Sequence, residues 1–395
     1  MDETMGYRSR QEYVRTQRSR YRKASRPEKG RILDEGRALF GIHRKSLVRA
    51  FARDPDRRKR RRGRKKHYGP ELDEPLKKVW LAAQQPCGKR LKKVLRIWLP
   101  HYEKHFGPLS RESAEKLLSM SPATIDRLLR PIRARRRKGL CATRSVRVLE
   151  GQIPIRTRFQ EVDGPGFIEA DTVAHCGQTM QGAFVWSLTF TDIWSGWTEN
   201  RAVWNRSARR VVEAIRDIER SLAFPIEGFD SDNGAEFLNH QLFRYFRDRP
   251  APICFTRSRP YRKNDNAHVE QKQWTHVRQL LGYDRFEDRR LVAPINDLYS
   301  QEWRALQNHF LPTMQLVSKS REEGRLRRRH GLPQTPCERL LASPQVLDED
   351  KEQLRREFSA LDPFDLQARL EAKLKKILRL VRRQTKMPKG APKAA

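Results

Sequence analysis

Three carboxylates, Asp171, Asp232 and Glu270, occupy positions from which they could act together on one substrate. Asp171 ends the apolar run FIEAD, Asp232 stands before Asn-Gly, which is a tight-turn signal, and Glu270 lies early in a predicted helix. Strand ends at one edge of a sheet and a nearby helix start can converge, and converging carboxylates repel one another without a counter-charge. Because hard divalent cations prefer oxygen ligands, the trio predicts a site for Mg²⁺ or Mn²⁺.

Such a site has a definite chemistry. Two divalent ions about 4 Å apart polarise a phosphodiester bond, activate the attacking oxygen and stabilise the leaving oxygen. The attacking group can be water or a DNA 3′-hydroxyl. Taken singly, each residue also has a plainer explanation, since Asp before Asn-Gly is often a turn residue and Glu early in a helix is favoured by the helix dipole. Asp171 is the strongest candidate for a functional role among the three, because a carboxylate that closes an apolar strand needs a cation or a metal.

The elements that would position this trio begin at residue 166, where the pattern of apolar residues changes. We expect strands over 167–171, 183–191, 197–204, 226–232 and 253–256. An amphipathic helix is expected between the third and fourth of these strands, with Val211, Val212, Ile215, Ile218 and Leu222 at helical spacing, and further helices are expected over 238–247 and 266–281. Strands followed by alternating helices and strands predict a mixed five-stranded sheet with helices on both faces, over residues 166–310.

Composition points to a polyanionic partner. The 395 residues carry a formal net charge of +36. Salt bridges within the chain cannot take up so large an excess of basic residues, so many of them must face a polyanion. Nucleic acid is the natural partner, because each neutralised phosphate releases counterions and adds affinity. An anionic membrane surface is the weaker alternative, since no apolar run is long enough to span a bilayer. The five cysteines are scattered without a CxxC pair, and the N-terminus lacks a secretory signal, so we expect a cytoplasmic, nucleoid-associated protein without a structural zinc.

Two basic, helical regions precede the predicted sheet. Residues 1–66 contain two short helices around Gly41, the outline of a helix-turn-helix whose second helix would present Arg44, Lys45 and Arg49 to DNA, followed by a basic linker. Residues 67–133 contain a second candidate, with helices capped by Ser110 and Ser121 and with Thr124, Arg127 and Arg130 facing outward. Ordinary helix packing explains either pair equally well. Residues 134–165 form a second basic linker.

The region after the sheet is expected to be helical over 311–384. One helix should begin at Thr335-Pro336 and another at Asp362-Pro363. The second has a stripe of Leu366, Leu370, Leu374, Ile377 and Val381, which is typical of packing or of a contact with a partner helix. Residues 385–395 are expected to be a disordered tail.

Three segments, GFIEADTVAHCG, FDSDNGAEF and RPYRKNDNAHVEQKQW, resemble the signature blocks of the DDE transposase/retroviral integrase superfamily, and most closely those of bacterial insertion-sequence transposases. The resemblance covers roughly residues 150 to 345. It implies an RNase H-like catalytic core in which Asp171, Asp232 and Glu270 are the catalytic, metal-binding residues. The zinc module that precedes retroviral cores is absent, so DNA-end recognition should rest on the helix-turn-helix regions.

Several neighbouring residues leave alternatives open. Asp230 lies two residues before Asp232 on the same strand face, but Asp232 occupies the D-N-G position. His175 could orient a water or contact phosphate, although a lone His is more often structural. Asn266 matches the D-N-A block, where capping of the Glu270 helix is sufficient explanation. Basic residues of the preceding loop would hold the DNA backbone; these are Arg257, Arg259, Arg262 and Lys263.

The resemblance therefore predicts a transposase that cleaves DNA at the ends of its mobile element and joins the 3′-hydroxyl ends to target DNA. Its partners would be the terminal inverted repeats, target DNA and further copies of itself, since two ends must be handled at once. One alternative is a DNA-binding regulator with a catalytically silent core. Another is an RNase H-like nuclease that does not join strands.

Overall fold

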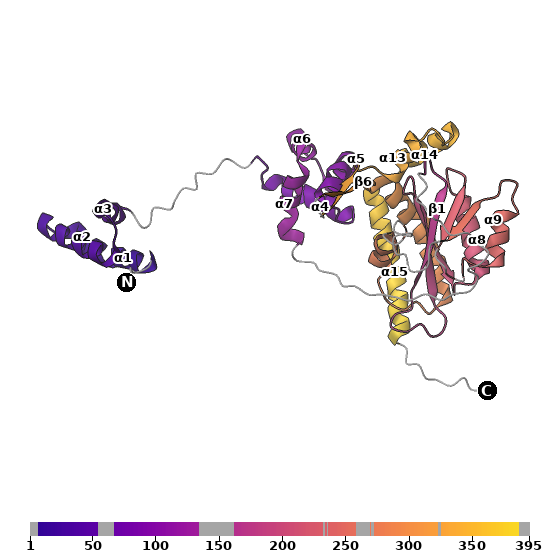
Figure 1. Cartoon of the computed structure of the whole chain (residues 1–395), viewed down its shortest axis with the longest axis horizontal. Coiled ribbons are helices and arrows are strands. Elements are labelled where there is room, and N and C mark those ends of the chain that lie inside the picture. The colour runs from indigo at the N-terminus through magenta and orange to yellow at the C-terminus, as the bar shows by residue number, and fades with distance from the viewer. Residues whose placement is uncertain are drawn as a thin grey trace. The chain divides into compact units, whose positions relative to one another are not determined.

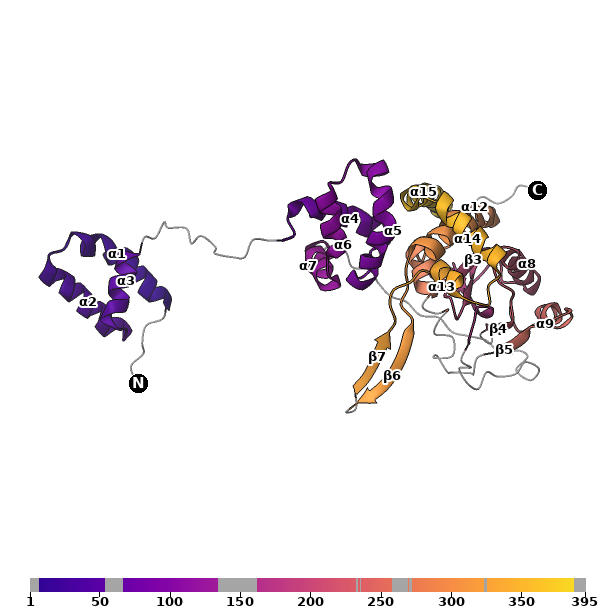
Figure 2. The ribbon, with the colours of Figure 1, turned by 90° about the horizontal axis from the view of Figure 1, so that it is seen from above.

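The computed structural model describes residues 7–53, 67–133, 162–231, 234, 236–257, 269, 272–322 and 325–386. The chain divides into two units, Met1–His67 and Tyr68–Ala395, which are treated separately (Figures 1 and 2). None of the described helices is both long and apolar enough to cross a membrane. The described cysteines, Cys87, Cys176, Cys254 and Cys337, are all free thiols.

The first unit is a bundle of three helices: α1 (Tyr7–Lys23), α2 (Arg26–Phe40) and α3 (Arg44–Ala52). The second and third match the predicted pair, and Gly41 ends α2 in the left-handed conformation with φ of 60°. Tyr21 of α1 stacks on Phe51 at 4.4 Å between ring centroids. Helix α1 was not predicted, because its seventeen residues are dominated by arginine and polar side chains and bury few apolar groups.

The second unit begins with four helices and a short turn of 3₁₀ helix: η1 (Pro70–Leu72), α4 (Asp73–Ala82), α5 (Gly88–Phe106), α6 (Arg111–Ser119) and α7 (Pro122–Arg133). Residues 83–87 separate α4 from α5. Both predicted caps are confirmed: Ser110 Oγ accepts from the Ser113 amide at 3.2 Å, and Ser121 Oγ accepts from the Thr124 amide at 3.1 Å.

A mixed five-stranded sheet follows: β1 (Phe167–Ala174), β2 (Val185–Asp192), β3 (Thr198–Trp204), β4 (Gly228–Ser231) and β5 (Cys254–Arg257). The strand order is β3-β2-β1-β4-β5. The first three strands are antiparallel, whereas β4 and β5 run parallel to β1. This confirms the predicted mixed sheet.

Helices cover both faces of this sheet, also as predicted (Figure 1). One face is covered by α8 (Ala208–Glu219) and α9 (His240–Arg247). The other face is covered by a series of short helical segments: η2 (Gln273–Arg278), α11 (Gln279–Leu281), η3 (Arg289–Leu291), α12 (Val292–Leu298), η4 (Tyr299–Trp303) and η5 (Leu306–Phe310).

The C-terminal region departs from the all-helical prediction. A two-stranded ribbon, β6 (Leu316–Glu322) and β7 (Arg325–His330), precedes its three helices, α13 (Pro336–Ala342), α14 (Asp348–Ala360) and α15 (Pro363–Lys386). The ribbon was missed because its charged sequence has no alternation of apolar and polar residues. The predicted helix starts are confirmed, and Thr335 forms a full capping box with Glu338.

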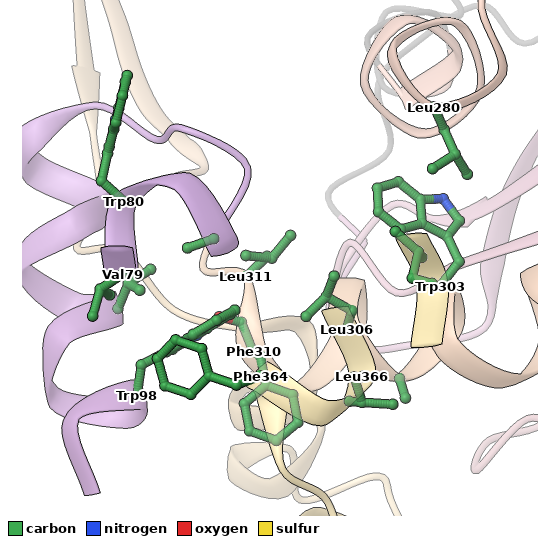
Figure 3. Close-up of a cluster of buried hydrophobic side chains, with 14 of the residues drawn as sticks. Val79, Trp80, Trp98, Leu280, Trp303, Leu306, Phe310, Leu311, Phe364 and Leu366 are labelled. Carbon is green, nitrogen blue, oxygen red and sulfur yellow. The ribbon is translucent and has the colours of Figure 1, made fainter. Parts of the chain in front are cut away.

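One apolar core joins the initial helices of the second unit to its C-terminal part (Figure 3). Trp98 of α5 donates its indole N–H to the Phe310 carbonyl at 3.2 Å and meets the Phe364 ring edge-on at 4.9 Å. The predicted α15 stripe is buried here at Leu366, Leu370, Ile377 and Val381, with Leu374 packed beside them. Its role is therefore packing within the chain.

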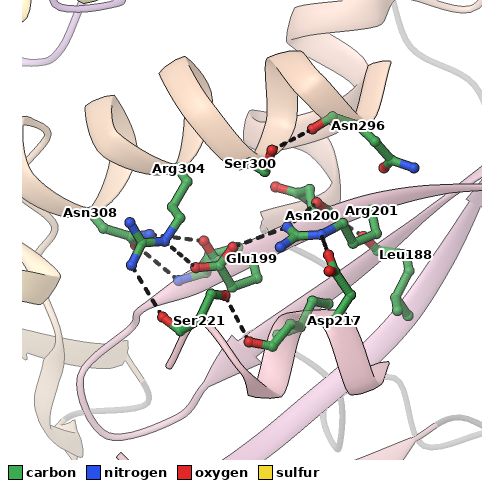
Figure 4. A network of polar contacts seen from close by, with 12 residues as sticks. Leu188, Glu199, Asn200, Arg201, Asp217, Ser221, Asn296, Ser300, Arg304 and Asn308 are labelled. Atoms are coloured by element: carbon green, nitrogen blue, oxygen red, sulfur yellow. Dashed lines mark hydrogen bonds and ion pairs between the residues drawn. The ribbon is translucent and has the colours of Figure 1, made fainter. Parts of the chain in front are cut away.

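Two asparagines, Asn296 and Asn308, hydrogen-bond to backbone groups along the outer edge of β3 (Figure 4). The Asn296 side chain accepts from the Ala202 amide at 2.6 Å and donates to the Ala202 carbonyl at 3.0 Å. Asn308 makes the same pair of bonds to Thr198, at 2.9 and 3.0 Å. Because an open strand edge is a template for another strand, these amides block edge pairing as well as holding the helices on the sheet.

Candidate active site

The parallel register of β1 and β4 brings two of the predicted carboxylate positions close together. Ala170 lies beside Ser231, and these residues directly precede Asp171 and Asp232. Paired strands are about 4.8 Å apart. Asp232 itself lies outside the described residues, and so does Glu270. The nearest preceding residues that the structure describes are Ser231 and Val269.

The residue before Glu270 is tied to the same place. Val269 is fully buried, and its amide donates to Glu169 Oε2 at 3.2 Å. Glu169 stands two residues before Asp171 on β1. The residues before each of the three predicted carboxylates, namely Ala170, Ser231 and Val269, are thus held around one stretch of β1.

Asp171 lies within β1 rather than at its end, which corrects the sequence-based placement. The strand continues to Ala174 because the residues after Asp171 go on pairing with β2, from Thr172 beside Leu188 to Ala174 beside Trp186. The Asp171 side chain is partly exposed, and its Oδ1 accepts from the Thr172 amide at 2.6 Å. Its carboxylate can therefore be reached from solvent although its backbone is fixed by the sheet.

Two buried carboxylates share a sheet face with Asp171. Alternation along β1 puts Glu169 on that face, and the register puts Asp230 beside Glu169. Glu169 is 0% exposed and Asp230 is 3% exposed. Asp230 Oδ1 accepts from the Thr256 hydroxyl at 2.6 Å, so Asp230 binds the neighbouring strand β5.

Sequence reasoning missed Glu169 because it was counted as part of an apolar strand. The signal was its i,i+2 relation to Asp171 in FIEAD, which places both on one side of a strand. The rest of this sheet face is also polar: Thr189 lies opposite Asp171, Thr191 lies opposite Glu169, and Asn200 donates to the Thr189 hydroxyl at 3.1 Å. The opposite face is apolar, with Ile168, Ala170, Leu188, Phe190 and Phe229 in one core.

A second polar cluster ties the residue after Asp171 to the segment after Asp232. Thr172 Oγ1 donates to Glu236 Oε1 at 2.8 Å, and Arg206 donates to both Glu236 oxygens at 3.0 and 3.1 Å. The Glu236 side chain is 1% exposed, and the Arg206 guanidinium lies 4.5 Å from the Trp186 ring centroid. Glu236 was overlooked although it stands within the quoted block FDSDNGAEF.

His175 is packed away from solvent. It is 0% exposed, its Nε2 lies 2.8 Å from Ser187 Oγ, and its ring stacks on Phe286 at 4.6 Å. Burial, and to a lesser extent the nearby charge of Arg278, lowers the pKa of His175 to about 3. The neutral, enclosed imidazole has a structural environment, in line with the plainer of the two alternatives.

The predicted DNA-contacting residues divide into three groups. Arg44, Lys45 and Arg49 are exposed on α3, and Arg127 and Arg130 are exposed on α7 with Thr124 partly exposed beside them. Arg259, Arg262 and Lys263 lie outside the described residues, and so does Asn266, the possible active-site neighbour. Arg257 was expected in a loop but is the last residue of β5 and is 5% exposed, because the strand extends one residue further to pair with Ser231.

One further group of described side chains, His105, Asp362 and Asp365, lies close enough together to surround a cation. Lys104 already supplies positive charge there, with its Nζ 3.3 Å from Asp362 and 3.2 Å from Asp365. Burial alone would raise the pKa of Asp362, but hydrogen bonds from His105, from the Asp365 backbone and from Lys104 hold it at about 2. Asp362 also accepts from the Phe364 amide at the start of α15. The cluster is therefore a junction between α5 and α15.

Comparison with known proteins places the chain in a family. No protein-family model matches it. The uncharacterized protein y4rM of Sinorhizobium fredii (strain NBRC 101917 / NGR234) is 38% identical over 339 residues, which span 84% of this chain and 95% of y4rM. The chain belongs to the y4rM family. The y4rM description names no activity, so this relationship assigns none.

Among solved structures, the catalytic core domain of BIV integrase aligns with 30% of this chain and 72% of that chain. The sequence identity of this alignment is 19% and its TM-score is 0.24. The relationship to y4rM extends over far more of the chain, so the family shares more than the sheet region.

Proposed function

We propose that this protein is a DDE-type transposase, which cleaves DNA at the ends of its mobile element and joins the 3′-hydroxyl ends to target DNA. One observation carries the proposal: the residues before all three predicted carboxylates, Ala170, Ser231 and Val269, are held together at one place on the sheet. Separate segments of the chain would supply Asp171, Asp232 and Glu270 to a common site.

The chemistry of the donors fits divalent cations. All three proposed ligands are carboxylates, and the buried Glu169 and Asp230 add oxygen-rich, acidic surroundings on the same face. Asp171, Asp232 and Glu270 would hold two Mg²⁺ or Mn²⁺ ions, which when bound polarise a phosphodiester bond. The chain's own residues would position this site: Glu169 binds the Val269 amide before Glu270, and Asp230 holds β4 to β5.

The substrate would be double-stranded DNA. The net charge of +36 favours binding to phosphates. The exposed basic residues of α3 and α7 would contact the terminal inverted repeats, and Arg259, Arg262 and Lys263 would hold the backbone near the carboxylates. Joining two ends requires two active sites, so the active form would be a homo-oligomer on the bacterial nucleoid.

The decisive test uses the full chain with duplexes that carry the inverted repeats flanking its gene. Asp171→Asn should abolish Mg²⁺-dependent cleavage and strand transfer while leaving DNA affinity unchanged. Asp348→Asn is the matched control, because that carboxylate is 96% exposed on α14 and should leave activity intact. Full cleavage by the Asp171→Asn variant would refute the proposal.

The same assay separates the neighbouring possibilities. Asp230→Asn should reduce cleavage less than Asp232→Asn, because Asp230 is engaged with Thr256. The reverse order would move the proposed ligand to Asp230. Cleavage without joining would indicate a nuclease, and specific binding without cleavage by the unaltered chain would indicate a silent regulator.

A further inference from the structure

The ribbon formed by β6 and β7 pairs with no other strand in the described part of the chain. Its two strands pair with each other from Leu316 beside His330 to Glu322 beside Arg325. Figure 2 shows it extending from the helices and sheet of the second unit. Val317 near its base is 72% exposed. An isolated two-stranded ribbon without an apolar face is marginal on its own, so it is expected to be completed by a partner.

The composition of the ribbon indicates what that partner is. Residues 316–330 contain six Lys or Arg and two Glu. Arg327, Arg328 and Arg329 are consecutive and exposed on β7, and side chains alternate between the two faces of a strand, so both faces of the ribbon carry basic residues. A polyanion would neutralise this concentration of positive charge.

The base of the ribbon is firmly fixed. Thr313 and Gln334 exchange backbone hydrogen bonds of 2.8 and 3.1 Å below the two strands. Arg339 of α13, which is 5% exposed, donates to the Thr313 carbonyl at 2.7 Å and to the Ser195 carbonyl at 2.8 Å. The base of the ribbon is therefore connected to the turn that follows β2.

We propose that the β6–β7 ribbon inserts into the major groove of duplex DNA. That groove is about 12 Å wide and admits a two-stranded ribbon. At about 3.4 Å per residue, the seven residues of β6 span roughly 24 Å, about two-thirds of a turn of duplex. The inference takes the DNA substrate of the proposed function and adds a contact to it that the helical regions do not provide.

Other partners fit the ribbon less well. The major groove of A-form RNA is too deep and narrow for side chains to read. Proteins that bind single strands stack the bases on aromatic rings, and residues 316–330 contain no Phe, Trp or Tyr. Charged residues along an edge strand oppose the addition of a strand from another protein.

The test replaces three exposed arginines of β7 in the full chain: Arg327→Gln, Arg328→Gln and Arg329→Gln together. Fluorescence anisotropy with a random-sequence 30-base-pair duplex, in buffer containing EDTA, should show affinity at least about 10-fold weaker. The slope of log affinity against log salt should become shallower by up to about 3, because each lost phosphate contact removes about 0.9. The matched control removes the same charge from exposed positions of α15, with Lys375→Gln, Lys376→Gln and Arg379→Gln.

The control should change the affinity much less than the ribbon variant does. The variant with Arg327→Lys, Arg328→Lys and Arg329→Lys together should keep most of the salt slope. Unchanged circular dichroism of both β7 variants would show that the fold is intact. The loss of affinity should be greater for duplex DNA than for double-stranded RNA of equal length or for vesicles of anionic lipid. Equal losses on all of these ligands, or equal losses in the ribbon and α15 variants, would overturn groove insertion.

Because the binding assay contains no divalent ion, its outcome is independent of cleavage. A ribbon effect in a protein that never cleaves DNA would leave this inference standing and would remove only the proposed function. Conversely, an active transposase whose ribbon variant binds normally would retain the proposed function and lose the ribbon contact.

Discussion

The cluster formed by Glu236, Arg206 and Thr172 gives a quantitative prediction about how the candidate site is held together. Glu236 is almost fully buried and receives three hydrogen bonds, two from Arg206 and one from Thr172. Arg206 is 38% exposed on its side-chain surface, so the two partners are unequally desolvated. Removing one should therefore cost a different free energy from removing the other.

Arg206→Met keeps an apolar side chain over Trp186. It leaves the buried Glu236 carboxylate with only one of the three hydrogen bonds named above, the one from the Thr172 hydroxyl. Loss of one partner of a buried ion pair costs about 3–5 kcal/mol of unfolding free energy. Glu236→Gln keeps an acceptor for Thr172 and leaves a guanidinium that water can solvate, so we expect a loss of about 1–2 kcal/mol. Arg206→Met should thus be the more damaging change.

The double variant isolates the interaction. Once Glu236 is neutral, Arg206→Met no longer strands a charge, so the double variant should be less destabilised than the two single losses together. We expect a coupling energy of about 1.5–3 kcal/mol, measured by urea unfolding of all four proteins at one pH. Additivity within about 0.5 kcal/mol would refute the ion-pair reasoning.

The cycle also has a functional readout, because Thr172 follows Asp171 directly. If the cluster positions the carboxylates, Glu236→Gln should slow cleavage while leaving DNA affinity unchanged. Arg209→Met is the matched control for the arginine, since Arg209 is 82% exposed on α8 and pairs with Glu213 on the surface. Its effect on the unfolding free energy should fall below about 1 kcal/mol.

Two further predictions concern buried polar groups. His175 has a pKa of about 3 when folded and about 6.5 when unfolded, so the free energy of unfolding should fall by up to about 1.4 kcal/mol per unit as pH drops from 6.5 towards 3. In urea unfolding at several pH values, the His175→Gln variant should lose this part of the slope of unfolding free energy against pH, and parallel curves for the two proteins would contradict the assignment. Burial raises the pKa of Asp192 to about 6, so Asp192 contributes a slope of the opposite sign between about pH 4 and 6 in both proteins. Asn308→Ala leaves the buried N–H and C=O of Thr198 without their partner and should lower the unfolding free energy by about 2–5 kcal/mol. Asn296→Ala should cost less, because Asn296 is only partly buried. A smaller loss for Asn308→Ala than for Asn296→Ala would argue against the edge-capping role.

The sheet could be predicted because its strands carry local signals. Runs such as AFVWSLTFT are rich in β-branched and aromatic residues, and Val211, Val212, Ile215 and Ile218 mark α8 at helical spacing. Caps at Ser110, Ser121 and Thr335 were equally readable, since a capping side chain bonds to an amide two or three residues away. Such features depend on short stretches of chain.

What failed depended on distant partners or on unusual composition. Whether β1 stops at Asp171 or continues to Ala174 is decided by pairing with β2, which lies beyond the intervening loop. Helix α1 and the β6–β7 ribbon carry many arginines and few buried apolar groups, so neither hydrophobic period is present. The Asn296 and Asn308 caps lie 94 and 110 residues from the backbone groups that they satisfy, which no local pattern can reveal.

The two faces of the sheet explain why Glu169 and Asp230 accompany the proposed ligands. Side chains two residues apart on a strand point the same way, so any strand that aims Asp171 or Asp232 at a metal also aims Glu169 or Asp230 at the same side. These two carboxylates are buried, and each binds a neighbouring segment: Glu169 holds the Val269 amide and Asp230 holds Thr256. Alternation thus gives each strand one carboxylate for anchoring and one that the proposed site would use for chemistry. The anchoring pair fixes Val269, which precedes Glu270, and strand β5 against β1 and β4, which is the alignment that the proposed site requires.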